Sequence, residues 1–225
     1  MLVVIPARGG SKRLKDKALK ELAGKPLLVW AIDRAKASGF EFVVATESDR
    51  LIAVATVDGA PTWKRDLSTA TDDAPDYSWA KELPDRYPAH DQFCILRITS
   101  PFFSAKYARQ QVSRLTPAFT SIRAATPVSS HPAKMWTHYG GGIYMPILAG
   151  HHDDGTPWHS SPTQTLLAVH HQTAGCEVMW AQTLRDGSLA GDRVGLYVID
   201  GPAALDINTP EDWAQAEEIA KTWTP

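Results

Sequence analysis

Short apolar runs recur along the chain at the spacing expected of an alternating strand and helix fold. The clearest are Leu2–Ile5, Phe42–Ala45 and Phe93–Ile98, the last interrupted by Arg97, and each is bounded by polar or turn-forming residues. Continuous apolar runs of this length are typical of strands buried on both faces. Further strands are predicted at 120–124, 177–181 and 194–199.

Helical periodicity occupies the intervals between these runs. Apolar residues from Leu27 to Ala35 recur at helical spacing, with Pro26 predicted at the first helical position and Gly39 just past the end. Other predicted helices cover 49–57, 77–86, 106–115 and a last helix from residue 210. This alternation predicts an α/β fold, Rossmann-like, with a mostly parallel sheet and helices on both faces.

Residues 127–175 interrupt the alternation. They are rich in proline, histidine and glycine and have no clear periodicity. A structureless loop of this length inside a compact domain is unusual unless it is functional. We therefore predict one domain over 1–225, with 127–175 as an excursion from the sheet.

The loop after the first strand combines flexible residues with positive charge. Its flexible residues are Gly9, Gly10 and Ser11, and its cations are Arg8, Lys12, Arg13, Lys15 and Lys17. Glycines let consecutive N–H groups converge on an anion, and the cations supply the charge that a polyphosphate needs. The loop favours a nucleotide site, with an ordinary turn carrying solvated lysines as the alternative.

Polar residues also follow the other predicted strands, at the edge where open α/β sheets bind ligands. They are Thr46–Ser48, Thr99 and Ser100, and Asp206 and Asn208. Two oxygens at positions i and i+2 of an extended chain point to the same side, so Asp206 and Asn208 are candidate ligands of one Mg²⁺ ion. The alternative is an exposed turn at Asp206 followed by a helix cap.

Composition narrows the class of protein. The net charge of −2 argues against a nucleic-acid binder, and no apolar segment approaches the length of a membrane span. The opening apolar run is too short for a signal peptide. Cys94 and Cys176 are distant in sequence and lie in strand-like runs, which indicates core packing in a reducing cytoplasm. No helical zinc-binding pattern accompanies the histidines.

The opening loop resembles the signature of the acylneuraminate cytidylyltransferases, which make CMP-sialic acid and related CMP-sugars. The matching residues are Ala7-Arg8-Gly9-Gly10-Ser11-Lys12, Lys17 and Gly24-Lys25-Pro26. Later segments resemble further elements of that family. These are Leu67-Ser68 with Asp72 and Ala74, Thr99-Ser100-Pro101, His131-Pro132 with Lys134, and the run from Asp206 to Trp213.

The resemblance implies a sheet of the nucleotide-diphospho-sugar transferase type and assigns roles to residues. Nucleotide binding falls to Ala7, Arg8, Gly10, Ser11, Lys12, Lys17, Ser68, Arg97, Thr99 and Ser100. Sugar binding falls to Thr46, Lys134 and Gln164, and Mg²⁺ binding to Asp206 and Asn208. Arg8, Lys17 and Asp206 form the predicted catalytic set. In this family the inserted segment covers the sugar and helps to build a homodimer.

Four positions depart from the family pattern. Ala18 replaces an asparagine, Arg97 a glutamine and Asn208 an aspartate, and Thr163 stands where an arginine binds the sugar carboxylate. Arg97 has five donors and could contact a base carbonyl in place of the glutamine. An acid sugar without its arginine would leave a carboxylate unpaired.

The predicted function is transfer of CMP from CTP to a sugar, with release of pyrophosphate. The predicted partners are CTP or another nucleoside triphosphate, a sugar and a second copy of the chain. One alternative is a nucleotidyltransferase of the same fold with another nucleotide or acceptor. The other is a binding protein without catalytic activity.

Overall fold

The computed structural model describes residues 1–11 and 13–223, and the chain divides into two compact units. The first, called the core unit here, contains Met1–Ala124 and Thr173–Pro225. The second, called the insert unit, contains Ala125–Gln172. The predicted Lys12 contact lies outside the described residues.

A seven-stranded sheet is the centre of the structure in its described part. In spatial order its strands are β11 (Val194–Val198), β7 (Ser121–Pro127), β10 (His170–Trp180), β6 (Gln92–Leu96), β1 (Leu2–Pro6), β4 (Glu41–Thr46) and β5 (Thr62–Lys64). The pairs β6–β1, β1–β4 and β4–β5 are parallel, whereas β10 runs antiparallel to β6. The prediction of a mostly parallel sheet is confirmed.

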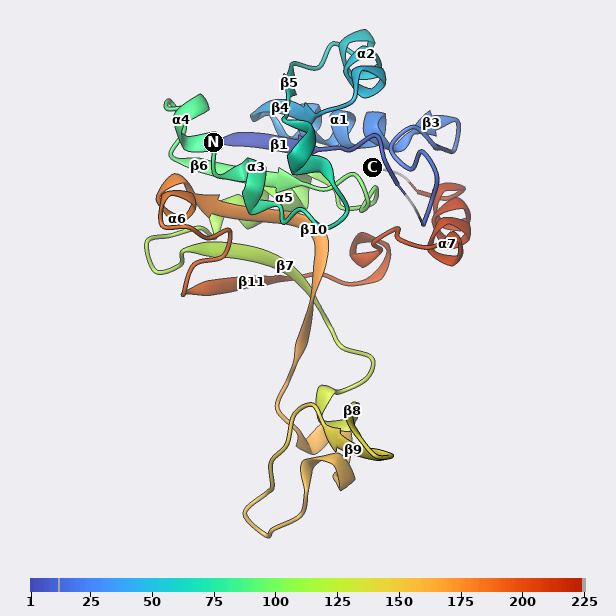
Figure 1. Ribbon diagram of the computed structural model, residues 1–225, viewed down its shortest axis with the longest axis vertical. Helices are drawn as coiled ribbons and strands as arrows, with labels where there is room; N and C mark the ends of the chain where they lie inside the picture. Colours follow the sequence, from blue (N-terminus) through green and yellow to red (C-terminus); the bar gives the residue numbers. More distant parts are fainter. Residues whose placement is uncertain (12, 224–225) are drawn as a thin grey trace. The chain divides into compact units, whose positions relative to one another are not determined.

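Helices cover both faces of this sheet in the core unit (Figure 1). They are α1 (Leu27–Ser38), α2 (Asp49–Val57), α3 (Tyr77–Ala80), α4 (Leu83–Arg86), α5 (Ala105–Ser113), α6 (Ala181–Arg185) and α7 (Pro210–Ala220). On β1, Val3 and Ile5 pack with α1, α2 and α5, whereas Leu2 and Val4 pack with α3, α4 and α6. This period of two explains why the whole run is apolar.

The C-terminal end of α1 agrees with the sequence prediction, but its N-terminal end does not. Gly39 ends the helix in the left-handed conformation, with φ 76°, as predicted. Pro26, however, is the residue before the first helical residue. It pairs instead with Glu21 in a two-stranded ribbon of β2 (Glu21–Leu22) and β3 (Lys25–Pro26). The strand that leads into the helix therefore displaces Pro26 from the predicted position.

The helix predicted over 77–86 is wrong, because the structure has two short helices there, α3 and α4. Pro84 lies in the first turn of α4. Proline has no N–H group to continue a helical ladder, so it is tolerated in a first turn but not in a helix interior. The break between the two helices follows from this residue.

A third apolar cluster fixes the chain near the opening loop. Leu14, Leu22, Phe102, Ile207 and Trp213 are buried together. They come from the opening loop, from β2, from the turn after β6, from the segment before α7 and from α7 itself. Packing among them holds several ends of the sheet in fixed positions.

The insert unit contains a β-hairpin that the sequence pattern did not predict. Its strands are β8 (Trp136–Gly140) and β9 (Ile143–Pro146), and three glycines with positive φ form the turn. The short 3₁₀ helices η2 (Pro132–Lys134), η3 (Trp158–Ser160) and η4 (Thr163–Thr165) complete the unit. Most residues of both strands are exposed, so no alternation of apolar and polar positions marks them.

The two cysteines are core residues and neighbours. Cys94 and Cys176 are both fully buried free thiols, and their Sγ atoms lie 2.7 Å apart between β6 and β10. The contact with Cys176 and burial together raise the pKa of the Cys94 thiol. Core packing is confirmed, but each cysteine has a partner that the sequence did not reveal.

Candidate functional site

The opening loop packs against the segment that follows β4. The Gly9 N–H donates a 2.6 Å hydrogen bond to Oε1 of Glu47. A side chain at Gly9 would lie 3.0 Å from Ser48, so this close approach favours glycine. Arg65 is buried and donates to the carbonyl of Ala7. The Gly9 N–H is thus bound to an internal carboxylate, whereas Gly10 is exposed and Ser11 partly so.

Arg8 lies at the carboxyl end of β1 and is half-exposed. Its Nη1 is 2.9 Å from Oδ1 of Asp72 and also donates to the carbonyl of Thr71. This ion pair joins the opening loop to the segment after η1 (Leu67–Ala70). Ser68 is an exposed residue of η1, where its N–H donates to Asp66. The structure therefore connects two of the predicted nucleotide elements through Arg8.

Lys17 connects the opening loop to the segment before α7. Its ammonium donates to the carbonyl of Ile207 at 2.8 Å and to Oδ1 of Asn208 at 3.4 Å. Burial lowers the pKa of Lys17, and the charge of Asp206 opposes that shift. Lys17, Asp206 and Asn208 therefore form one cluster, although Lys17 is distant from the others in sequence.

Asp206 and Asn208 contact each other directly. The Asn208 Nδ2 donates to Oδ2 of Asp206 at 2.6 Å. The other carboxylate oxygen, Oδ1, is buried without a hydrogen-bond partner among the described residues. An unpartnered carboxylate oxygen fits a cation. No group of three or more His, Cys, Asp or Glu side chains in the described residues could hold a metal by itself.

A capping box fixes the position of this cluster at the start of α7. The Asp212 N–H donates to the Thr209 hydroxyl, and the Asp212 carboxylate accepts from the N–H groups of Asn208 and Thr209. Burial would raise the pKa of Asp212, but these hydrogen bonds lower it. The predicted helix cap is confirmed.

The turn after β6 lies beside the same segment. The Ile207 N–H donates to the carbonyl of Thr99 at 2.8 Å. Ser100 is fully buried, and its hydroxyl has no partner among the described residues. Thr99 and Ser100 are therefore brought next to Lys17 and Asp206, at the edge of the sheet where the sequence placed them.

Arg34 of α1 holds this turn from inside. Its buried guanidinium donates to the carbonyls of Ser100, Phe103 and Arg97. Burial lowers the pKa of Arg34 to about 10, so it is charged at neutral pH. Because the turn carbonyls accept from one cation, Arg34 determines the backbone path on which the candidate site depends.

Replacing Arg34 with methionine is expected to lower the free energy of unfolding by about 3 kcal/mol, because buried carbonyls lose their donors. Urea denaturation measures this change. Arg109→Met is the matched control, since exposed Arg109 makes one hydrogen bond, to the carbonyl of Ala37. The control is expected to cost less than about 1 kcal/mol. Equal effects of the two variants would contradict the role given to Arg34.

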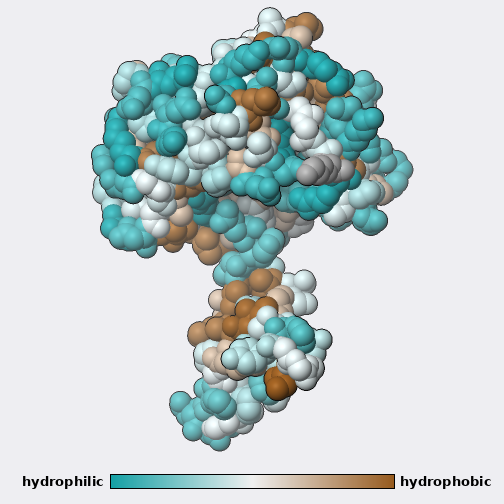
Figure 2. Space-filling view, viewed as in Figure 1, coloured by the Kyte–Doolittle hydropathy of each residue, from teal (hydrophilic) through white to brown (hydrophobic). Residues whose placement is uncertain are grey.

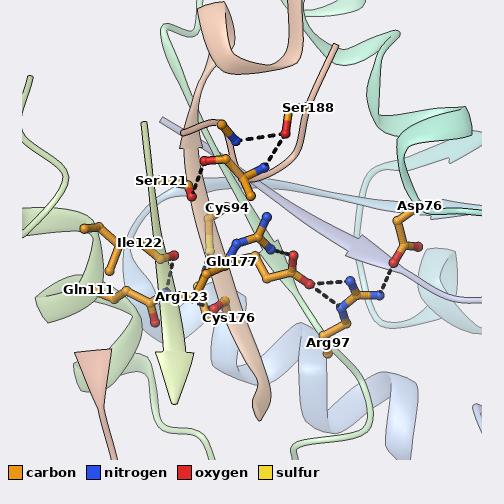
Figure 3. A network of polar contacts seen from close by, with 12 residues as sticks. Asp76, Cys94, Arg97, Gln111, Ser121, Ile122, Arg123, Cys176, Glu177 and Ser188 are labelled. Atoms are coloured by element: carbon orange, nitrogen blue, oxygen red, sulfur yellow. Dashed lines mark hydrogen bonds and ion pairs between the residues drawn. The ribbon is translucent and has the colours of Figure 1, made fainter. Parts of the chain in front are cut away.

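Arg97 is an ion-pairing residue in this structure (Figure 3). Its Nη1 lies 2.7 Å from Oδ2 of Asp76, and its Nε and Nη2 both contact Oε1 of Glu177. The other oxygen of Glu177 pairs with Arg123 of β7. The sequence placed Arg97 at the nucleotide but gave no sign of its two partners, Asp76 and Glu177.

Two positions of the core unit have buried side chains: Thr46, a predicted sugar contact, and Ala18, a departure from the family pattern. Thr46 is fully buried, and its hydroxyl accepts from the N–H of Ser48, so the predicted sugar contact finds no support. Ala18 stands where the family that the sequence resembles has asparagine. It is 3% exposed and packs in the core, so position 18 contributes to core packing in this chain.

The remaining predicted sugar residues lie in the insert unit. Lys134 of η2 and Gln164 of η4 are both exposed. His131, the first residue of the motif that contains Lys134, is buried and bonds the N–H of Ala133 and the carbonyl of Leu167. His131 therefore organises the insert unit and does not face solvent.

Comparison with known proteins places the chain in a family. Residues 2–137 match the family model described as cytidylyltransferase. The chain belongs to this family. It is 32% identical over 231 residues to the pseudaminic acid cytidylyltransferase of Campylobacter jejuni serotype O:2, covering 98% of the chain and 96% of that relative.

A second relative and a solved structure are also similar to the chain. The chain is 25% identical over 218 residues to the N-acylneuraminate cytidylyltransferase of Streptococcus agalactiae serotype III. That match covers 94% of the chain and 51% of the relative, so the chain spans about half its length. A solved CMP:2-keto-3-deoxy-manno-octonic acid synthetase complexed with CTP has the same fold, with TM-score 0.70, 17% identity and 98% coverage of both chains.

Sequence reasoning missed several charged residues that are buried or partly buried. They are Arg65, Asp76, Arg123 and Glu177. Arg123 and Glu177 stand inside strand segments that are otherwise uncharged. Because a buried charge needs a partner, these two positions could have indicated an ion pair from the sequence.

Among the residues that the structure describes, every helix is too short or too polar to span a membrane.

Proposed function

We propose that the protein transfers CMP from CTP to the hydroxyl of an acid sugar and releases pyrophosphate. The observation that carries the proposal is the cluster of Lys17, Asp206 and Asn208 beside the Thr99 turn. The family and the names of its relatives support CTP and an acid sugar as substrates.

The residues of the core unit would act by binding and orientation. Arg8 and Lys17 would hold the triphosphate, with Arg8 exchanging Asp72 for a phosphate oxygen. The acceptor oxygen attacks the α-phosphorus in line, the new O–P bond forms, and the bond between the α-phosphorus and the oxygen that joins it to the β-phosphorus breaks. The proton of the acceptor hydroxyl passes to water, and the charge that develops on pyrophosphate lies near the two cations.

A magnesium ion is proposed as the cofactor. The unpartnered Asp206 Oδ1 fits such an ion, whereas the Asn208 amide is already engaged with Asp206 and Lys17. Asp206 would therefore be the main protein ligand, and phosphate oxygens would complete the set. The ion, when bound, neutralises charge on the triphosphate.

A nucleotidyltransferase with another nucleotide or acceptor is the second candidate. Two observations favour it: Ala18 is buried and replaces the asparagine of the family that the sequence resembles, and Arg97 replaces the glutamine of that family. The experiment measures pyrophosphate release with each nucleoside triphosphate against acid sugars, neutral sugars and sugar phosphates. Release with CTP and an acid sugar supports the first candidate, and release with another pair supports the second.

We also propose a homodimer formed through the insert unit, in a cytoplasmic setting that suits the two free thiols. Large apolar side chains are exposed on this unit (Figure 2). They are Trp136, Tyr139, Ile143, Tyr144, Met145, Ile147 and Leu167. Apolar surface gathered in this way marks an interaction site.

The double variant Tyr139→Lys with Ile143→Lys is expected to convert a dimer to a monomer, because two charges would be buried in the proposed contact. Light scattering measures the mass in solution. Val57→Lys is the matched control, since Val57 is 91% exposed but lies on α2 of the core unit. A wild-type monomer, or a dimer unaffected by the double variant, would contradict the proposed interface.

A further inference from the structure

A network of four charged residues includes Arg97, which shortly precedes Thr99 of the candidate site in the sequence, and it has no part in the mechanism above. It consists of Arg123, Glu177, Arg97 and Asp76, in contact in that order (Figure 3), and is called the Arg97 network here. It connects β7 and β10 to the carboxyl end of β6 and to the start of α3.

Exposure increases from one end of the Arg97 network to the other. The side chains of Arg123 and Glu177 are each 5% exposed, that of Arg97 is 24% exposed and that of Asp76 is 34% exposed. Burying an ion pair is costly, so it is weak evidence of stabilisation. In this network the buried carboxylate of Glu177 accepts hydrogen bonds from two nitrogens of Arg97. These contacts fix the plane of the accessible Arg97 guanidinium.

The charges of the Arg97 network indicate the kind of ligand that fits. Two cations balance two carboxylates. A phosphate or a sugar carboxylate at Arg97 would be a third anion around a guanidinium that already has two. A neutral group that offers hydrogen-bond acceptors carries no such repulsion, and the edge of a nucleobase is such a group.

The donors of Arg97 narrow the choice further. Its contacts with Glu177 and Asp76 use three N–H groups, and among the described residues the remaining two have no partner. Two donors match the adjacent O2 and N3 acceptors of cytosine. Uracil has an N–H group at position 3, so one donor would face another donor.

We propose that Arg97 is a specificity-determining residue that selects cytosine over uracil, and that Glu177 and Asp76 are positioning residues that orient its guanidinium. This inference rests on the proposed function, because it assumes a nucleotide at the carboxyl end of β6. Arg123 holds the second oxygen of Glu177 and so keeps the carboxylate turned toward Arg97.

The test compares the dissociation constants of CTP and UTP by calorimetry, without acceptor. The wild-type protein is expected to bind CTP at least about tenfold more tightly than UTP, as a two-donor base contact allows. Arg97→Lys keeps the charge but loses the planar pair of donors, so it is expected to bring this ratio close to one. Glu177→Gln is expected to do the same while raising KM for CTP more than it lowers kcat.

A double-variant cycle separates positioning from general damage. If Glu177 acts through Arg97, adding Glu177→Gln to Arg97→Lys leaves the CTP to UTP ratio unchanged. Glu82→Gln is the matched control, because Glu82 pairs with Arg86 on a half-exposed surface, and it is expected to keep the wild-type ratio. Should Glu177→Gln not fold, the more exposed Asp76→Asn tests the same orientation and is expected to lower the ratio several-fold.

Folded variants that retain the wild-type ratio, or a wild-type ratio near one, would overturn the inference. Failure of the proposed function gives a different result, namely no pyrophosphate release by the wild-type protein with CTP and any acceptor. Release that persists while the Arg97 and Glu177 variants leave base selection unchanged would contradict this inference alone.

Discussion

Lys17→Ala is expected to lower kcat/KM for pyrophosphate release by about two to three orders of magnitude. The substitution removes an ammonium that touches the carbonyl of Ile207 and the amide of Asn208, next to the carboxylate of Asp206. In the proposed reaction this cation stabilises the charge that develops on the triphosphate. Steady-state kinetics with CTP and the preferred acid sugar measure the loss.

Lys15→Ala is the matched control for this substitution. Lys15 lies in the same loop and is exposed, so its removal is expected to change kcat/KM by less than about threefold. Both variants should unfold at similar urea concentrations. A Lys17→Ala protein with near wild-type activity, or a Lys15→Ala protein with an equal loss, would contradict the assignment of Lys17 to the reacting phosphates.

Asp206→Asn is expected to have an effect of similar size, about two orders of magnitude or more in kcat/KM. Asp206 supplies the carboxylate of the cluster, and its Oδ1 has no partner among the described residues. An amide in its place has one oxygen and no charge, so the affinity for Mg²⁺ should fall. Initial rates over a Mg²⁺ titration, together with calorimetry of Mg²⁺ binding with CTP present, measure both changes.

Two further variants sharpen the Asp206 result. Asn208→Asp adds a second carboxylate beside Asp206 and is expected to lower the Mg²⁺ concentration required for half-maximal activity. Asp200→Asn is the control, because Asp200 is exposed and its side chain makes no cap contact with the short helix η5 (Gly201–Ala204). If Asp206→Asn retained the wild-type Mg²⁺ requirement, the proposed metal ligand would be wrong.

The sheet and most helices could be predicted because their burial is regular. The helix over 49–57 has these bounds in the structure, and β1, β4 and β6 coincide closely with the predicted apolar runs. The hairpin of β8 and β9 could not be predicted, because its exposed strands carry no alternation. Pro84 inside the predicted 77–86 helix was a local signal that should have divided it.

The site residues at the ends of strands could be predicted from the sequence, but the side chains that pair with them could not. Arg8, Lys17, Thr99 and Asp206 all come from segments at the carboxyl edge of the sheet, a rule that needs only strand positions. The pairing of Arg97 with Glu177 joins residues 80 positions apart and requires β10 to lie next to β6. Sequence periodicity gives neither the order of strands nor their register.

Contacts inside the site also change the interpretation of the opening loop. The loop was expected to present its N–H groups to a phosphate, but the Gly9 N–H is bound to Glu47. Anion binding would then depend on Arg8, on Lys17 and on the more exposed part of the loop. This division explains why the side chains of Arg8 and Lys17, and not the glycines, carry the largest predicted effects.

The most direct test of CMP transfer is mass spectrometry of the product formed from CTP and an acid sugar, with pyrophosphate measured in the same reaction. The proposed function predicts a product whose mass is that of the acceptor plus CMP less one water, with one pyrophosphate formed for each product molecule. Formation of CDP or free phosphate, or the absence of any CMP-linked product across the acid sugars, would contradict it.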